Sequence, residues 1–360
     1  VLLKVYKTCC VKMLNAITVC SGIGAPEVAG FNVIAQSEID SHANSVLRHH
    51  YPNVQNLGDM VTANWHEWDA DLLVGGTPCV SFSMLGDRQS LSDERGNLAL
   101  KFVDVFEQVK AGIFVYENVS SILTTSDNAF GCLLSRMVGA KEPLYRSRWN
   151  SAGFLVGDTG SVAWRVLDAK YFTLPQRRSR VFVVGFNFRN GKRLFSKKPR
   201  QDCRGLAGIP AAIMFEPSSE KWNIKESQYV KSQASRDDEI SSISAPIICF
   251  TSKDNGRDWG INIAPTLRAG AFNKSRVNGG VKPAIIYREG DELITRYLSP
   301  VECLRLQGFP NNYLDILHNN NPLVDGAKYR LIGNSMAVPV MSWIRLRIEK
   351  VVAEVNFNLY

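Results

Sequence analysis

A cysteine at the end of an apolar segment is the first residue in this sequence whose position suggests chemistry. Residues 75–83 read Gly-Gly-Thr-Pro-Cys-Val-Ser-Phe-Ser and follow an apolar run at 71–74. An average cysteine is more often a small buried hydrophobe than a nucleophile. Here a polar, glycine-containing loop follows, and ligands of open α/β sheets bind beyond the carboxyl ends of strands. The segment therefore favours Cys79 as a nucleophile over a core thiol.

A carboxylate is expected beside this cysteine. Glu117 comes directly after a second apolar run, residues 113–116, and the carboxyl ends of neighbouring parallel strands meet at one edge of a sheet. A carboxylate near a thiol suggests an acid paired with a nucleophile. Without Cys79, a helix-capping or exposed role would be the better interpretation of Glu117.

Two arginines form a third candidate group. Residues 176–180 read Gln-Arg-Arg-Ser-Arg and precede another apolar run at 181–186. Side chains alternate along a strand, so Arg178 and Arg180 share one face and could reach the same pocket. A solvated edge strand would explain the same charges without any pocket.

A nucleoside site is indicated by a glycine turn and two carboxylates. The turn is Cys-Ser-Gly-Ile-Gly at residues 20–24, and position 27 is Glu where a dinucleotide-binding turn would have a third glycine. Glu38 is placed to accept hydrogen bonds from two ribose hydroxyls, and Asp59 to accept an adenine amino proton. Alone, each feature could be a structural turn or a surface carboxylate. Together they outline an adenosine site rather than an NAD site.

Short strands and the helical segments between them must position these groups. The helix pattern is clearest where apolar residues recur three and four positions apart from Leu98 to Val109. Strands alternating with helices predict a doubly wound, mostly parallel, Rossmann-like α/β sheet. The expected strands are residues 16–20, 33–37, 71–74, 113–116, 162–167 and 181–186.

The amino-acid composition of the chain changes after residue 188. The next hundred residues are rich in Ser, Asn, Gly and Lys, with short β-like pieces at 247–251 and 284–287. We interpret them as a smaller, irregular, mainly β domain. The expected organisation is a peripheral extension (1–12), a catalytic domain (13–188), the smaller domain (189–292), a bridging hinge segment (293–332) and a C-terminal helix returning to the catalytic domain (333–360).

Helix signals return near the C-terminus. Ser299 is placed to cap a helix, Pro300 suits its first turn, and Glu302 completes a capping box. A long helical stretch then runs from Met336 to about Glu354.

The net charge of +8 has one concentrated source. Residues 189–200, Arg-Asn-Gly-Lys-Arg-Leu-Phe-Ser-Lys-Lys-Pro-Arg, hold six basic residues and no acidic one. Most charge runs are solvated linkers, whereas a polyanion contact would be the functional interpretation. The run alone does not decide between the two.

Composition excludes several classes of protein. Hydrophobic residues make up 45% and charged residues 21%, as in ordinary globular domains, and no apolar run is long enough to cross a bilayer. The eight cysteines show neither zinc-ligand spacing nor a disulfide framework. We therefore expect a cytoplasmic protein with reduced thiols and no metal.

The order of these segments resembles the cytosine-C5 DNA methyltransferases of the bacterial and phage modification type. The resemblance runs from about Ile17 to Pro339, apart from the middle of 189–292. It departs at Cys20, where the family usually has an aromatic residue, and at 1–12, which have no counterpart. The segments that carry it are CSGIG, Glu38, GD at 58–59, TPCVSFS, YENV, LPQRRSR, RYLSPVECLRLQGFP and IGNSMAVP.

The resemblance implies a role for each candidate. Cys79 would add to C6 of a cytosine flipped out of duplex DNA, and Glu117 would hold a proton at N3. Arg178 and Arg180 would line the catalytic pocket, with Arg180 at the base O2. S-adenosyl-L-methionine would be the cofactor and S-adenosyl-L-homocysteine its product. The expected cofactor contacts are Ser21, Gly22, Ile23, Gly24, Glu38, Ile39, Asp59, Met60, Pro78, Leu98, Asn334 and Ser335.

Asn334 is distant in sequence from the other cofactor contacts, so the C-terminal segment should fold back onto the first domain. Residues 189–292 lie where the family keeps its target-recognition domain. Double-stranded DNA is the expected partner. We expect the protein to be a monomer that does not bind membranes and that is associated with the nucleoid when it is bound to DNA. A cognate restriction endonuclease is a further partner that the resemblance allows. The expected DNA contacts are Ser83, Arg88, Gln89, Arg189, Lys192 and Arg193.

Three alternatives remain at this point. One branch of the family methylates tRNA, but the long variable region after residue 188 and the basic run favour DNA. An inactive relative that only binds DNA is disfavoured by the intact set of Cys79, Glu117, Arg178 and Arg180. A nicotinamide oxidoreductase is disfavoured by the missing third glycine and by the segment around Cys79.

Overall fold

The computed structural model describes residues 13–78, 98–126, 128–195, 203–215, 246–251, 257–269 and 282–358. The expected extension at 1–12 and the last five residues of the basic run, 196–200, lie outside these described residues. Four expected site residues also lie outside them: Cys79, Ser83, Arg88 and Gln89.

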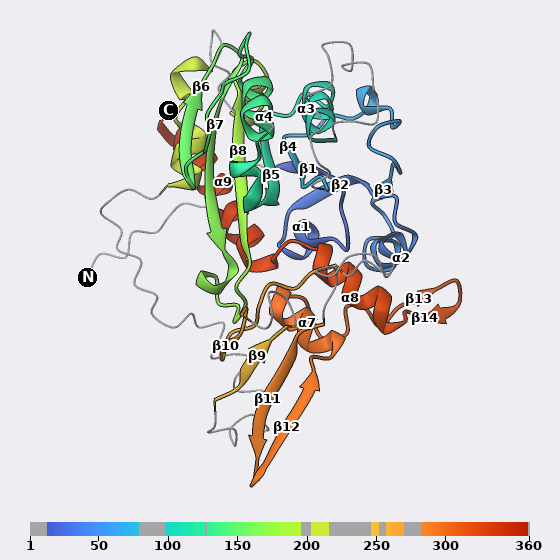
Figure 1. Cartoon of the computed structure of the whole chain (residues 1–360). Coiled ribbons are helices and arrows are strands. Elements are labelled where there is room, and N and C mark those ends of the chain that lie inside the picture. Colours follow the sequence, from blue (N-terminus) through green and yellow to red (C-terminus); the bar gives the residue numbers. More distant parts are fainter. Residues whose placement is uncertain are drawn as a thin grey trace, which may run out of the picture.

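An eight-stranded mixed sheet forms the centre of the molecule, with strand order β3-β2-β1-β4-β5-β8-β7-β6 (Figure 1). Neighbours from β3 to β5 are parallel. The pairs β5–β8, β8–β7 and β7–β6 are antiparallel. The strands are β1 (Asn15–Val19), β2 (Asn32–Ser37), β3 (Gln55–Asn56), β4 (Leu72–Gly75), β5 (Ile113–Val119), β6 (Ala152–Val156), β7 (Gly160–Asp168) and β8 (Ser179–Asn187).

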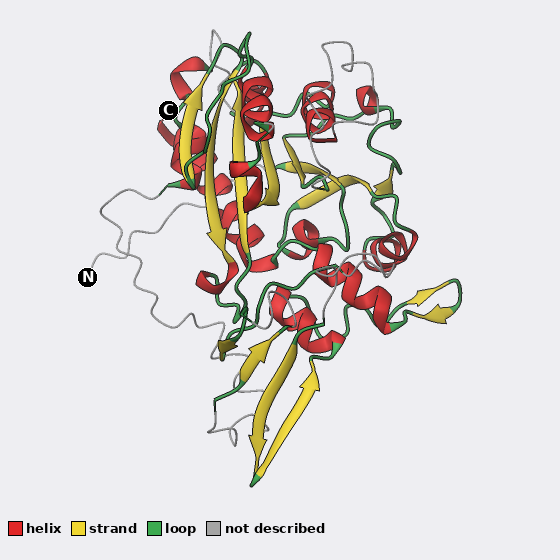
Figure 2. Cartoon of the chain, in the orientation of Figure 1, coloured by secondary structure: helices red, strands yellow, loops and turns green. Residues whose placement is uncertain are grey.

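Helices cover both faces of this sheet (Figure 2). Successive residues of β1 divide between two cores: Ala16 belongs to the core that also holds side chains of α1, α5 and α9, whereas Ile17 belongs to the core that holds side chains of α3 and α4. This alternation produces near-continuous apolar strands, as expected of a sheet buried on both sides. The helices are α1 (Ala25–Val28), α2 (Ser41–His50), α3 (Leu98–Gln108), α4 (Ala129–Val138), α5 (Ile209–Met214), α7 (Pro300–Gln307), α8 (Asp325–Asn334) and α9 (Val338–Asn358).

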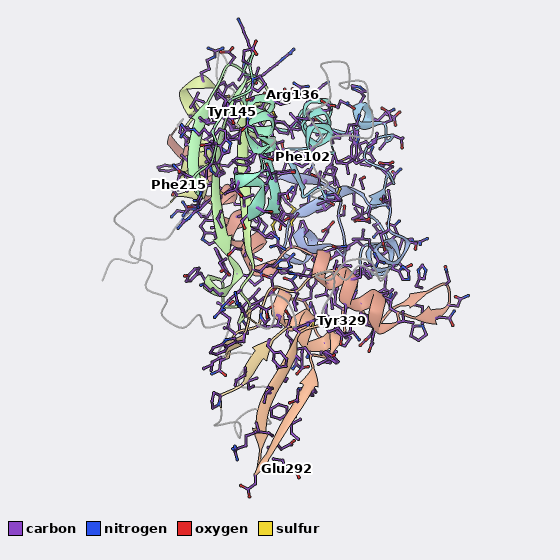
Figure 3. All side chains as sticks on the ribbon, in the orientation of Figure 1. Phe102, Arg136, Tyr145, Phe215, Glu292 and Tyr329 are labelled. Atoms are coloured by element: carbon purple, nitrogen blue, oxygen red, sulfur yellow. The ribbon has the colours of Figure 1, made fainter. Side chains whose placement is uncertain are left out.

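Short 3-10 helices join several of these elements. In the face covered by α3, Phe102 packs edge to face against Phe114 and Tyr116, with ring centroids 5.8 and 5.0 Å away (Figure 3). These rings fix α3 over β5. The 3-10 helices are η1 (Trp65–Glu67), η3 (Ser120–Thr124), η4 (Ala169–Tyr171), η5 (Asn190–Leu194) and η6 (Arg204–Leu206).

A smaller antiparallel sheet extends below the large one in the order β10-β9-β11-β12 (Figure 1). Its hairpin of β11 and β12 ends in a turn beside Glu292, far from the central sheet (Figure 3). A separate two-stranded hairpin of β13 and β14 packs against α2. The strands are β9 (Ile248–Phe250), β10 (Gly260–Ile261), β11 (Ala284–Glu289), β12 (Glu292–Tyr297), β13 (Leu317–His318) and β14 (Asn321–Pro322).

The border between the two parts differs from the expected one. Helix α5 packs against α9, β7 and β8, and Ile209 and Ile213 are buried in that core. Residues 190–195 likewise run back along the large sheet, where Leu194 and Phe195 are buried. Residues 190–195 and 203–215 therefore belong with the large sheet, because their apolar side chains find their burial there.

Most expected elements are confirmed. All six expected strands of the first domain form, and Ser299 and Glu302 make the capping box of α7. One boundary was misplaced: Glu117 and Asn118 lie inside β5 rather than after it, because pairing with β8 continues to Val119. No helix among the described residues is long and apolar enough to cross a membrane.

Candidate active site

The glycine turn after β1 adopts backbone angles that L side chains rarely adopt. Cys20, Gly22 and Gly24 have φ of 49°, 58° and 85°. A Cβ on Gly24 would lie 3.1 Å from the Tyr313 hydroxyl, whereas a Cβ on Gly22 would enter open space. Gly24 is therefore needed for packing as well as conformation, and Gly22 faces space that a ligand could fill.

Glu38 and Asp59 come to this turn from the next two strands. Glu38 accepts hydrogen bonds from the Gly22 amide at 2.7 Å and from the Asp40 amide at 2.8 Å. Asp59 is exposed and accepts from the Val61 amide at 2.9 Å. Burial first, and then the charges of Glu38 and Asp59, raise the pKa of the Cys20 thiol to about 12. The two carboxylates and Cys20 therefore surround one location.

This location fits the adenosyl part of S-adenosylmethionine. The space in front of Gly22 is open, and carboxylate acceptors stand on two sides of it. Expected contacts at its border are placed as follows: Ile39 is exposed beside Glu38, and Met60 is buried behind Asp59. Among the described residues, no group of His, Cys, Asp and Glu side chains could hold a metal ion.

The end of β4 packs tightly against β5. A Cβ on Gly76 would lie 2.9 Å from Glu117 Oε2 and 3.0 Å from Met336 Cε. Thr77 shares a hydrogen bond of 2.8 Å with the Tyr116 hydroxyl, and its carbonyl accepts from Asn118 Nδ2 at 3.3 Å. The backbone leading into Pro78 is thereby fixed beside Glu117.

Glu117 and Arg180 form a charge pair at this edge. Arg180 Nε lies 3.2 Å from Glu117 Oε1, and their side chains are 15% and 13% exposed. Glu117 Oε1 accepts no hydrogen bond from the described residues. Burial raises the pKa of Glu117, against the opposing charges of Arg180 and Arg178. The carboxyl group is thus biased toward its protonated form.

Arg178 is buried and bonds to backbone rather than to Glu117. Its guanidinium donates to the carbonyls of Leu267 at 2.9 Å, Gly333 at 3.2 Å and Ser335 at 2.6 Å. It was expected in the catalytic set with Arg180, and the alternation did place both on one face. Its contacts instead make it the group that joins β8 to the smaller domain and to the C-terminal segment.

The C-terminal segment does fold back onto the site. Met336 reaches Gly76, and Gly333 packs so closely that a Cβ there would lie 2.3 Å from the backbone of Arg268. Asn334 is exposed at the end of α8, and Ser335 is buried directly after it. Of the remaining expected contacts, Leu98 begins α3 and is partly buried.

The basic positions 189, 192 and 193 lie at the opposite edge of the sheet. β8 pairs Arg180 with Val119 and Phe186 with Ile113, so the chain after β8 continues at the amino ends of the parallel strands. Arg193 pairs there with Asp69 and Asp71, and Arg189 and Lys192 line a surface cavity of about 460 Å³. They are not brought together with Glu117, which corrects the expectation that this segment belongs to the target-recognition part.

Three polar residues that contribute to the site are not predicted from the sequence. Asn118 holds Thr77, and its inward direction follows from strand alternation. Gln176 is fully buried, donating to the Leu306 carbonyl at 2.7 Å and accepting from the Leu267 amide at 3.1 Å. Arg268 is exposed, and its charge lowers the pKa of Arg180 after burial and against Glu117. No sequence signal marked Arg268.

The fold and the site define an α/β protein with a glycine turn flanked by Glu38 and Asp59 and an acid–arginine pair at the carboxyl edge of its sheet. The chain matches the family described as C-5 cytosine-specific DNA methylase over residues 14–350. It belongs to this family, whose members methylate cytosine in DNA, so the expected class of enzyme is confirmed.

Individual relatives agree over most of the chain. A type II methyltransferase, M.DsaV of Dactylococcopsis salina, is 25% identical over 92% of this chain and 84% of its own length. A protein of Escherichia phage P1 named DNA N-6-adenine-methyltransferase is 30% identical over 93% of this chain, which spans only 61% of that protein.

Solved structures share the fold. The Dnmt2 methyltransferase of S. pombe covers 96% of this chain and 100% of its own, with a TM-score of 0.54 at 18% identity. The expected methyltransferase-type sheet is therefore confirmed.

Proposed function

We propose that this protein transfers a methyl group from S-adenosylmethionine to carbon 5 of a cytosine flipped out of double-stranded DNA. The observation that carries the proposal is the charge pair of Glu117 and Arg180, placed against the end of β4 from which Cys79 follows. Family membership supports the reaction type.

The chemistry requires an attack that activates the base. Cytosine C5 is a poor nucleophile until a group adds at C6. Addition of the Cys79 thiolate there, while Glu117 holds a proton at N3, turns C5 into an enamine carbon. The bound cofactor supplies an electrophilic methyl group on its sulfonium. Loss of the C5 proton to a base then breaks the bond from Cys79 to C6.

The acid and its partner suit this role. Burial raises the pKa of Glu117, so the carboxyl group can donate to N3 closer to neutral pH than an ordinary glutamate could. Arg180 would donate to the base O2, and positive charge at this edge would favour the Cys79 thiolate. Arg178 holds the surrounding backbone in place.

The adenosyl group would bind at the glycine turn. Glu38 and Asp59 offer acceptors for the ribose hydroxyls and the adenine amino group, and Gly22 leaves the space. The family requires the cofactor, and these donor and acceptor types match it.

We assign target recognition to the small sheet and the segments around it, because it stands beside the carboxyl edge through Arg178 and Gln176. The substrate would be duplex DNA in the bacterial cytoplasm, bound by a monomer. The type II relatives make a cognate restriction endonuclease a natural partner.

Expression in a host without DNA methylation, followed by bisulfite sequencing of the plasmid, tests the proposal. We expect protected cytosines at one short sequence and none with Cys79→Ala. A duplex containing 5-fluorocytosine should trap the wild-type protein covalently. A plasmid without any protected cytosine would contradict the proposal.

Two competing substrates are measured in the same experiment. The name of the P1 relative concerns adenine N6, so nucleosides from digested plasmid should be separated by mass for both methylated bases. Equal amounts of duplex DNA and tRNA in one methylation assay discriminate the nucleic acid. Methyladenine or methylated tRNA as the main product would replace our proposal.

A further inference from the structure

A chain of buried polar groups runs beneath the glycine turn. Glu27 in α1 is buried, and its Oε1 lies 3.1 Å from Thr18 Oγ1. Thr18 Oγ1 is 2.8 Å from Ser21 Oγ. Ser21 Oγ lies 3.2 Å from the carbonyl oxygen and 3.2 Å from the amide of Ser37. The reaction described above uses none of these side chains.

This chain of hydrogen-bonding groups contacts all three segments of the adenosyl site. Ser21 opens the glycine turn, and Ser37 immediately precedes Glu38. The Ser37 hydroxyl donates to the Gly58 carbonyl at 2.6 Å, next to Asp59. A change at one end of the chain can therefore alter all three segments that would hold the cofactor.

The chain is not fully satisfied. Glu27 Oε2 and both polar atoms of the Gln36 amide have no hydrogen-bond partner, and they are three of the five such buried side-chain atoms in the described residues. The register of β1 and β2 places Gln36 beside Thr18 on the face that α1 covers. Buried polar atoms are normally paired, and exceptions call for an explanation.

The proton on Glu27 decides the direction of the hydrogen bonds. When Glu27 is neutral it can donate to Thr18, Thr18 to Ser21, and Ser21 to the Ser37 carbonyl. When Glu27 is ionised, Thr18 must donate to it, and the single Ser21 proton is needed by both Thr18 and Ser37. Only the neutral form satisfies the Thr18–Ser21 contact and the bond from the Ser21 hydroxyl to the Ser37 carbonyl together, whereas the bond from the Ser21 amide to that carbonyl, at 3.1 Å, forms in either state.

We propose that Glu27 is a positioning residue for the cofactor turn, acting through Thr18 and Ser21, and that its protonated form is the one that binds S-adenosylmethionine tightly. This inference rests on the proposed function. Burial raises the pKa of Glu27 to about 7, against the hydrogen bonds that it accepts, so the protonation state changes within the physiological range.

Among the described residues, the groups packed around Glu27 do not supply a neutralising cation. Tyr51 after α2 and Tyr313 before α8 are the titratable side chains whose pKa values respond to Glu27. On α9, Arg345 donates to the Ala29 carbonyl at 2.9 Å and pairs with Glu349 at 2.6 Å. Its charge is thus engaged by Glu349 and by the C-cap of α1.

Calorimetric titration of the intact protein with S-adenosylhomocysteine at pH 6, 7 and 8 tests this inference. Each pH is measured in two buffers of different ionisation enthalpy, which reports protons taken up on binding. If only the neutral form binds, the affinity of the wild type falls about tenfold from pH 6 to pH 8. Proton uptake accompanies binding near pH 7.

Glu27→Gln carries a permanent amide donor, so it should bind at pH 8 as tightly as at pH 6 and take up fewer protons. Thr18→Val interrupts the chain at nearly constant volume and should also remove the pH dependence, at lower affinity. Glu67→Gln, an exposed change, should keep the wild-type profile.

A wild-type pH profile in either Glu27→Gln or Thr18→Val would overturn the inference, as would a wild type whose affinity does not change with pH. A wild type that binds no S-adenosylhomocysteine at any pH would instead contradict the proposed function.

Discussion

The two edges of the large sheet each hold a carboxylate paired with an arginine at 3.2 Å, and the two pairs differ in how completely they are satisfied. At the amino edge, Asp71 accepts from Arg193 Nε through one oxygen and from the Asn15 amide through the other. At the carboxyl edge, Glu117 Oε1 has Arg180 near it but accepts no hydrogen bond from described residues.

The difference distinguishes a pair that stabilises the fold from a pair that can take part in a reaction. A buried carboxylate whose oxygens both accept hydrogen bonds holds its surroundings together. A buried carboxyl group with an oxygen that accepts no hydrogen bond keeps a raised pKa, and that oxygen remains available to bind a substrate. Residue types alone do not distinguish these pairs, whereas the hydrogen bonds around them do.

The largest effect on the methylation rate is expected from a substitution of Glu117. Glu117→Gln should lower the methylation rate about 10²- to 10⁴-fold, because the amide cannot deliver a proton to N3. Cofactor affinity should change little, whereas thermal stability should fall because Arg180 loses the carboxylate beside it. Single-turnover methylation with S-adenosylhomocysteine titration as control measures both. Retention of more than a tenth of the rate would contradict the assigned role.

Glu27 is a third buried carboxyl group, and it forms no ion pair with the described residues. Burial raises the pKa of Glu27 from its ordinary value of 4.5 to about 7 in the folded state, so its contribution to stability is present below pH 4.5 and lost as pH rises through 7. At pH 8, Glu27→Gln should be more stable than the wild type by about 3 kcal/mol at most. At pH 4.5 the gain should vanish. Urea unfolding at both pH values measures it; an equal gain at both would contradict the raised pKa.

Much of this architecture could be predicted from the sequence because its signals are local. Apolar runs gave the six strands of the first domain, and the alternation in residues 176–180 placed Arg178 and Arg180 on one face. The capping box at Ser299 is equally local, since its partners lie three residues apart.

Long-range choices could not be predicted in the same way. The sequence does not say that Arg178 would bond to carbonyls of Gly333 and Ser335, because its partners lie more than 150 positions away in the chain. The basic run looked like a phosphate contact, yet Asp69 and Asp71 at the other edge compensate Arg193. Burial of apolar residues in α5, not composition, decided where the domain border falls.

Asp71 provides the matched test of a satisfied pair. Asp71→Asn should lower the free energy of unfolding by about 2 kcal/mol, because the buried Asp71 loses its charge pair with the half-buried Arg193 and its bond from the Asn15 amide is weakened. The methylation rate below the unfolding transition should be unchanged. Chemical denaturation and rate measurements at low temperature together separate the two effects. A rate loss as large as that of Glu117→Gln would mean that the two edges are not functionally distinct.

The smallest expected effect concerns DNA binding at the two edges. Arg268 is exposed beside Arg180 at the carboxyl edge, whereas Lys192 lies at the amino edge. Arg268→Ala should weaken duplex binding and lower the slope of log affinity against log salt by about 0.9, the value of one phosphate contact. Lys192→Ala should leave that slope unchanged. Fluorescence anisotropy over a salt series compares the two. The same slope change in Lys192→Ala would place DNA along the amino edge as well, and would restore the basic run as a contact.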